Sequence, residues 1–150
     1  MSEGDAERKA WLGTLARAPA EALAARWAAL GLAPTHDLLR PPEIGAVMVR
    51  GRAGGTGAPF NLGEMTVTRC SVRLADGTVG HGWVPGRDGD HATRVALCDA
   101  LLQTAEAARV QAEVVAPLAA AAEAKTAAEA AKAAGTKVEF FTLVRGEDRA

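Results

Sequence analysis

The segment Met65–Leu74 constrains the fold of this chain more than any other stretch. Its side chains alternate with the period of two that is typical of a β-strand with one buried face. The alternation predicts a core-facing set, which is Thr66, Thr68, Cys70, Val72 and Leu74. It places on the opposite face Met65, Val67, Arg69, Ser71 and Arg73. Ala75-Asp76-Gly77 then signals a tight turn, and Thr78–Val84 is predicted to return as the antiparallel partner strand.

Helices are predicted on both sides of this hairpin. Asp5–Ala18 and the segment from Pro19 to Gly31 carry apolar residues at helical spacing and predict an αα-hairpin, with Trp11 and Trp27 in the core. A third helix is expected to begin after a cap at Asp88 or Asp90 and to end or kink at Pro117.

Further elements complete the predicted domain. Ile44–Arg50 reads as a strand that Gly45 weakens, Leu118–Ala134 as an alanine-rich solvated helix, and Lys137–Arg145 as a terminal strand with apolar residues on both faces. We therefore expect residues 1–150 to form a single α+β domain. It would contain an N-terminal helical hairpin, an antiparallel sheet of about four strands covered by helices, and a C-terminal strand.

Composition excludes several classes of protein. A net charge of −1 over 150 residues argues against a basic nucleic-acid binder, and 49% hydrophobic residues argue against a disordered tail. No segment is apolar enough to span a bilayer, and the polar N-terminus carries no signal region. Cys70 and Cys98 lack metal-ligand spacing and are predicted to be buried thiols in a reducing compartment, which favours the cytoplasm.

Two groups of residues are candidates for binding an anion. The loop Gly54-Gly55-Thr56-Gly57 offers backbone N–H groups, but it lacks the lysine and the following helix of a phosphate-binding loop, and a simple turn is the favoured interpretation. The arginines Arg69, Arg73 and Arg87 carry guanidinium groups suited to phosphate or phosphonate oxygens. A solvated sheet face is the interpretation that the residues alone favour.

No catalytic or metal-binding set is evident in the sequence. His36, His81 and His91 have no metal-ligand spacing and are predicted to be polar surface residues. His91 with Asp88 or Asp90 is a possible acid–base pair, but no nucleophile lies nearby, and Glu64 has no assigned role. A chain with these residues is poorly equipped to act alone as an enzyme.

Several separated motifs together carry a family resemblance. They are WL-x-x-LA-x-A-x-x-x-x-L from Trp11, GGTG-x-x-FNLGE-x-TVTRC-x-VRL-x-DG from Gly54, GRD-x-x-HA from Gly86 and FFTLVRG from Phe140. In these motifs the chain resembles the G subunit of the bacterial carbon–phosphorus lyase system, and the resemblance covers nearly its whole length. One position departs: Thr93 stands where an acidic residue is expected, which weighs against an acid–base role for this helix start.

The resemblance implies an obligate subunit in phosphonate metabolism. The expected partners are the H, I and J subunits in a core complex with two-fold symmetry, together with the L protein. The H, I and L proteins would support, with this chain, displacement of adenine from MgATP by a phosphonate at the ribose C1′. MgATP would be a substrate of the complex, and no cofactor is expected on this chain. The arginine face and the glycine loop, with Glu64, Asp88 and His91, would then either help to hold polyphosphate or form the contact with a partner such as the I subunit. The alternatives for the whole chain are a structural adaptor that never touches substrate and an independent anion-binding protein.

Overall fold

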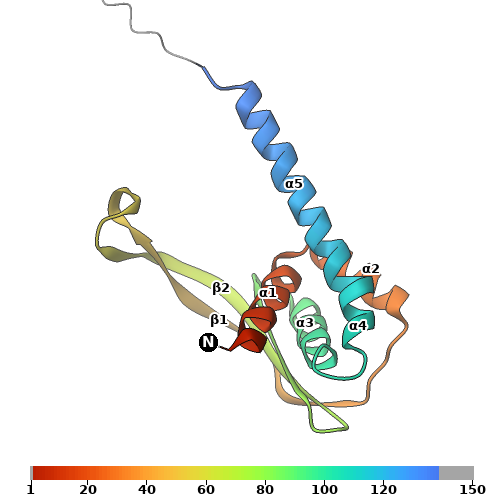
Figure 1. Ribbon diagram of the computed structural model, residues 1–150. Coiled ribbons are helices and arrows are strands. Elements are labelled where there is room, and N and C mark those ends of the chain that lie inside the picture. The colour runs from red at the N-terminus through yellow and green to blue at the C-terminus, as the bar shows by residue number, and fades with distance from the viewer. Residues whose placement is uncertain (1, 139–150) are drawn as a thin grey trace, which may run out of the picture.

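The computed structural model describes residues 2–138. Helices pack against one face of a three-stranded antiparallel sheet, and two elements project from this body, a long β-hairpin and the last helix (Figure 1). The elements in chain order are α1 (Glu3–Arg17), α2 (Ala20–Leu30), β1 (His36–Arg52), a 3-10 turn η1 (Ala53–Gly55), β2 (Pro59–Leu74), β3 (Val79–Pro85), α3 (Gly89–Leu101), α4 (Ala107–Val110), a π-helical turn η2 (Gln111–Val115) and α5 (Ala116–Gly135). The predicted α+β class is confirmed.

The predicted helical hairpin forms from local signals. Ser2 and Asp5 make a reciprocal capping box, in which each side chain accepts the backbone N–H of the other residue and so satisfies free donors at the start of α1. Gly31 ends α2 with a left-handed φ of 68°. Leu15 and Leu23 are fully buried, so the two helices enter the core along the predicted stripes.

The central β-hairpin is confirmed, with β2 longer than predicted and β3 shifted by one residue. The sheet order is β1-β2-β3, and Gly77 takes the expected positive φ of 91° in the turn between β2 and β3. β1 starts at His36 and passes through Pro41 and Pro42, with register shifts on either side of Arg40. Prolines are tolerated there because β1 is an edge strand and the missing N–H removes no ladder hydrogen bond.

The paired strands continue well beyond the body. We call residues 44–52 and 59–65, with their connecting tip, the arm (Figure 1). Its residues are exposed except for Val47, Gly51 and Gly57, which are half-buried. The predicted terminal strand Lys137–Arg145 falls mostly outside the described residues, and the fourth strand stays a prediction.

Helix α3 packs very closely on β3. Asp88 caps α3, as predicted, by accepting the His91 backbone N–H at 2.9 Å. A Cβ atom at Gly80 or Gly82 would overlap backbone carbonyl oxygens of α3, from Ala96 and Ala92 respectively. These two glycines therefore allow the backbone of α3 to lie against the strand, which seals this face of the sheet.

The prediction that this helix continues to Pro117 is wrong. The helix ends at Leu101, where Thr104 donates its hydroxyl to the Leu101 carbonyl at 2.7 Å and competes with helix continuation. Gln103 also turns back and donates its side-chain amide to the Val79 carbonyl at 2.9 Å. Pro117 instead lies in the first turn of α5, directly after the π-helical turn η2.

The last helix is confirmed, with bounds of Ala116–Gly135. Leu118 anchors its first turn in the core, and the residues from Ala120 onward are exposed as the helix leaves the body (Figure 1). No helix within residues 2–138 has the length and apolar character needed to cross a membrane.

A fully buried carboxylate, Asp99, joins three elements. Arg8 of α1 donates to it from Nε at 3.1 Å and from Nη2 at 2.7 Å, and the Trp11 indole N–H donates at 2.9 Å. The backbone N–H of His81 in β3 donates at 2.8 Å. Both carboxylate oxygens are thereby satisfied, as burial of a charge requires.

Replacing Asp99 with alanine is expected to lower the free energy of unfolding by about 3 kcal/mol, because Arg8, Trp11 and the His81 N–H lose a shared buried acceptor. Urea denaturation followed by circular dichroism measures the change. Asp90→Ala, an exposed position in the same helix, should cost at most about 1 kcal/mol. Equal losses in the two variants would contradict this role for Asp99.

The two cysteines are free and buried, as predicted. Burial, with a smaller contribution from the neighbouring Asp99 charge, raises the pKa of the Cys98 thiol to about 12. Burial also raises the pKa of Cys70, although a hydrogen bond from Thr93 partly offsets the effect. Neither thiol is prepared for nucleophilic chemistry.

At pH 8 a thiol with this pKa is ionised in about one molecule in ten thousand. We therefore expect an aromatic disulfide reagent to label neither cysteine in the native protein and both in denaturant. Absorbance of the released thiolate counts the labelled groups. Rapid labelling of native Cys98 would show that the helix layer over it opens readily.

Candidate interaction surface

The face of the sheet opposite α3 has no covering layer among the described residues. We call it the outer face. Strand register places on it residues from all three strands, which are Asp37, Arg40 and Glu43 from β1, Arg69, Ser71 and Arg73 from β2, and Val79, His81 and Trp83 from β3. Half of the Trp83 surface is exposed, at 49%. Tryptophan and arginine are the residue types that most often dominate protein–protein contacts.

The arginines of the outer face are paired with carboxylates from β1. Glu43 accepts from Arg69 Nε and from Arg40 Nη1, each at 2.8 Å. Hydrogen bonds from Arg40 and Arg69 lower the pKa of Glu43 below its ordinary value. These ion pairs lie at the surface, so they orient the side chains but add little to the stability of the fold.

Arg73 makes a similar pair further along the strand. Its Nη2 atom lies 3.3 Å from a carboxylate oxygen of Asp37. The predicted arginine face is therefore a lattice of mixed charge, because each β2 arginine has a carboxylate opposite it. The alternation of charge in β1 was hidden in the sequence by the bulges around Pro41 and Pro42.

The predicted site residues fall into three separate places. The loop residues Gly54, Gly55, Thr56 and Gly57 form the tip of the arm, where Arg52 Nη1 donates to the Gly57 carbonyl at 3.2 Å. Arg69 lies ten residues beyond Pro59, or roughly 33 Å along an extended strand, so loop and arginine face form no common pocket. Glu64 lies on the arm opposite Met48 and is exposed.

The third place is the start of α3. Arg87 is exposed in the loop after β3, and Asp88 is engaged as the helix cap. The prediction that His91 is a surface residue is wrong: it is 5% exposed, and its Nε2 donates to the Leu15 carbonyl at 3.0 Å. The ring therefore ties α3 to α1, and Asp88 binds the His91 backbone instead of forming an acid–base pair with the ring.

Of the other two histidines, His81 lies on the outer face. Its Nδ1 atom is 2.8 Å from the hydroxyl oxygen of Ser71, and the side chain is exposed as predicted. His36 is also exposed and contacts the Pro34 carbonyl at 2.9 Å. Within residues 2–138 no group of three or more histidine, cysteine or acidic side chains is arranged to hold a metal ion.

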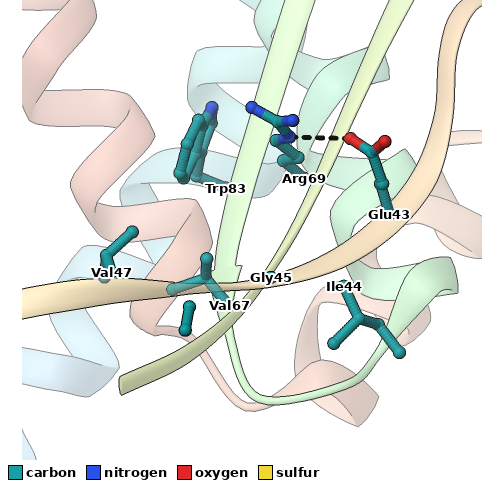
Figure 2. A pocket seen from close by; sticks show the side chains of 8 residues that line it. Glu43, Ile44, Gly45, Val47, Val67, Arg69 and Trp83 are labelled. Atoms are coloured by element: carbon teal, nitrogen blue, oxygen red, sulfur yellow. Dashed lines mark hydrogen bonds and ion pairs between the residues drawn. The ribbon is translucent and has the colours of Figure 1, made fainter. Parts of the chain in front are cut away.

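A hollow opens on the outer face where the arm leaves the body. We call it the Gly45 socket; its volume is about 310 Å³, and it is lined by Glu43, Ile44, Gly45, Ala46, Val47, Val67, Arg69 and Trp83. Figure 2 shows Trp83 and Arg69 side by side above Val67 and Gly45, with Glu43 bound to Arg69. The Arg69 guanidinium lies 5.6 Å from the centre of the Trp83 ring, a cation–π contact.

Beyond the socket the arm exposes large apolar side chains. Ile44, Met48, Phe60, Leu62 and Met65 are each between 42% and 62% exposed. Single exposed apolar residues are normal, but a series along one projecting hairpin is typical of a surface that a partner covers. Alternation along Met65–Leu74 did not reveal it, because the β2 part of the arm, residues 59–65, comes before that pattern in the chain.

Comparison with known proteins identifies the family. The family model described as "Phosphonate metabolism protein PhnG" matches residues 6–146. The chain belongs to the PhnG family. A relative from Rhizobium meliloti (strain 1021), "Alpha-D-ribose 1-methylphosphonate 5-triphosphate synthase subunit PhnG", is 46% identical over 146 residues, which cover 97% of this PhnG chain and 93% of the relative.

The Glu43 pairing in this PhnG chain predicts a measurable titration. Removing a donor with Arg69→Ala should move the pKa of Glu43 upward toward its ordinary value of 4.5. Since the folded pKa is depressed, the pairing stabilises the fold above the ordinary value and is lost as pH falls through the folded pKa. Carbon-13 NMR of the carboxyl group reports the midpoint. An unchanged midpoint in the variant would show that Arg69 does not hold Glu43 in solution.

Proposed function

We propose that this chain is an obligate, non-autonomous subunit of alpha-D-ribose 1-methylphosphonate 5-triphosphate synthase, in phosphonate metabolism. The observation that carries the proposal is the match over nearly the whole chain to a relative with that name. In this proposal the H and I subunits and the L protein are its partners in transferring ribose 5-triphosphate from MgATP to a phosphonate, with release of adenine. The J subunit joins the core complex, and MgATP is a substrate of the assembly.

The side chains of the described residues favour a non-catalytic role for this chain within the complex. The two thiols are buried, the His91 ring is engaged by a backbone carbonyl, and the exposed His81 has only Ser71 as a side-chain partner among the described hydrogen bonds. We infer that the chain binds no cofactor of its own and contributes surface to chemistry performed by its neighbours.

A structural adaptor that never touches substrate is the second candidate. The pairing of Arg69 with Glu43 and of Arg73 with Asp37 favours it, because a polyphosphate would meet two carboxylates beside the arginines. The double variant Arg69→Ala, Arg73→Ala separates the two roles. An intact complex with a raised KM for MgATP supports substrate binding, whereas loss of co-purification supports the interface.

The proposal is tested by reconstitution. The chain is co-expressed with the H and I subunits, the L protein is added, and the assembly is assayed with MgATP and methylphosphonate for released adenine and the ribose phosphonate product. We expect omission of this chain to reduce product at least 100-fold, because the complex is incomplete. The purified chain alone is the control and should give no product.

A reaction that proceeds at the same rate without this chain would overturn both the catalytic-support role and the adaptor role. Turnover by the chain alone would overturn its dependence on the other subunits.

A further inference from the structure

Gly45 creates the floor of the socket on the outer face. It lies within β1, where it pairs with Val67, and its φ is not in the left-handed region. A Cβ atom built at Gly45 meets nothing within 4 Å, so neither backbone conformation nor packing requires a glycine here. A glycine in a strand interior often marks a place where another chain approaches closely. The missing side chain leaves the hollow between Glu43 and Val47 open (Figure 2).

Arg69 is held in place at the rim of this hollow. Its Nε atom donates to Glu43 and its guanidinium lies against the Trp83 ring, so the group is fixed from two sides. Its terminal nitrogens, Nη1 and Nη2, donate no hydrogen bond to any of the residues that the structure describes. A guanidinium oriented in this way has donors available for a carboxylate at little cost in side-chain entropy.

The strand edge beside the socket is also open. On the free edge of β3, side chains from α3 and the turn after it bind the backbone groups: Gln103 donates to the Val79 carbonyl, and Asp99 accepts the His81 N–H. β1 pairs with β2 alone among the described strands, and its arm portion has an unpaired edge next to Gly45. An exposed edge of this length is a template for an added strand.

We propose that the Gly45 socket and the adjoining edge of β1 are the docking site for an extended, acidic segment of another synthase subunit. One apolar side chain of that segment fills the hollow over Gly45, against Val47, Val67 and Trp83. A neighbouring carboxylate of the segment accepts from the terminal nitrogens of Arg69. This inference rests on the proposed function and names the surface and the partner chemistry through which it operates.

Charge and shape favour this occupant over a nucleotide. Arg40, Arg69 and Arg73 outnumber the two carboxylates Asp37 and Glu43 by one, so the surface suits a single added carboxylate better than a triphosphate. Arg69 also already covers Trp83, which reduces the ring surface open to a base. The apolar lining of the socket instead matches a side chain of a protein.

Blocking the hollow is the sharpest test. Gly45→Ala adds a Cβ atom that meets nothing within 4 Å and fills the hollow partly. Gly45→Leu fills more of it. The full-length variants are titrated by calorimetry against the purified H subunit, I subunit and L protein in turn, and the subunit that binds wild type is the one compared among the variants. We expect Gly45→Ala to weaken binding about threefold and Gly45→Leu at least tenfold. Circular dichroism and thermal unfolding, unchanged from wild type, establish that each variant folds.

The arginine is tested against a matched neighbour. Arg69→Ala should weaken binding about tenfold and reduce the dependence of Kd on salt, because a carboxylate contact is lost. Arg73→Ala removes the other β2 arginine that is paired with a β1 carboxylate but lies outside the socket, and binding should stay within about twofold of wild type. Trp83 fluorescence should change on mixing in wild type and much less in Gly45→Leu.

The other possible results contradict either the socket or the proposed function. If wild type and all variants bind that subunit equally, the socket is overturned and the proposed function stands. If Arg73→Ala weakens binding as much as Arg69→Ala, general charge attraction replaces the socket. If MgATP alone changes Trp83 fluorescence in an Arg69-dependent way, the site binds nucleotide and the inference fails. If wild type binds no synthase subunit, the proposed function fails with it.

Discussion

The fold depends on one buried carboxylate. Asp99 accepts hydrogen bonds from α1 through Arg8 and Trp11 and from β3 through the His81 backbone, while its own helix packs on the strand at Gly80 and Gly82. These contacts tie the helical layer to one face of the sheet. The consequence is asymmetry, because the same strands present an uncovered face on their other side.

Packing stability is therefore concentrated in the body. The buried core draws its residues from the helices and from the body portion of β2 and β3, whereas most of the arm and α5 beyond its first turns are exposed (Figure 1). Isolated two-stranded ribbons and lone alanine-rich helices are marginal in water. Packing against a partner would stabilise elements of this kind, which agrees with a subunit that acts within a complex.

The sequence predicted the elements whose signals are local. The end of α2 at Gly31, the turn at Gly77 and the cap at Asp88 follow from residues close together in the chain. Alternation in β2 also identified Cys70 and Val72 as buried. These predictions needed no knowledge of tertiary contacts.

What the sequence could not show depends on distant partners. The burial of His91 requires the Leu15 carbonyl, and the end of α3 involves Gln103 reaching back to Val79. The pairing of the arginines with carboxylates requires the register of β1. The Gly45 socket arises only when Trp83 and Arg69 are placed above that glycine. Local patterns contain none of these pairings, so the sequence alone left both anion binding and a solvated sheet face open for the arginines.

The direct test of whether a partner subunit covers the arm and the Gly45 socket is hydrogen–deuterium exchange, compared between the chain alone and the assembled synthase. In the assembled synthase we expect the backbone amides of residues 43–52 and 59–69 to exchange much more slowly than in the chain alone. The amides of α3 should change little, because the core already protects them. Equal exchange of the arm in the free and assembled chain, with new protection confined to other surfaces, would contradict this expectation.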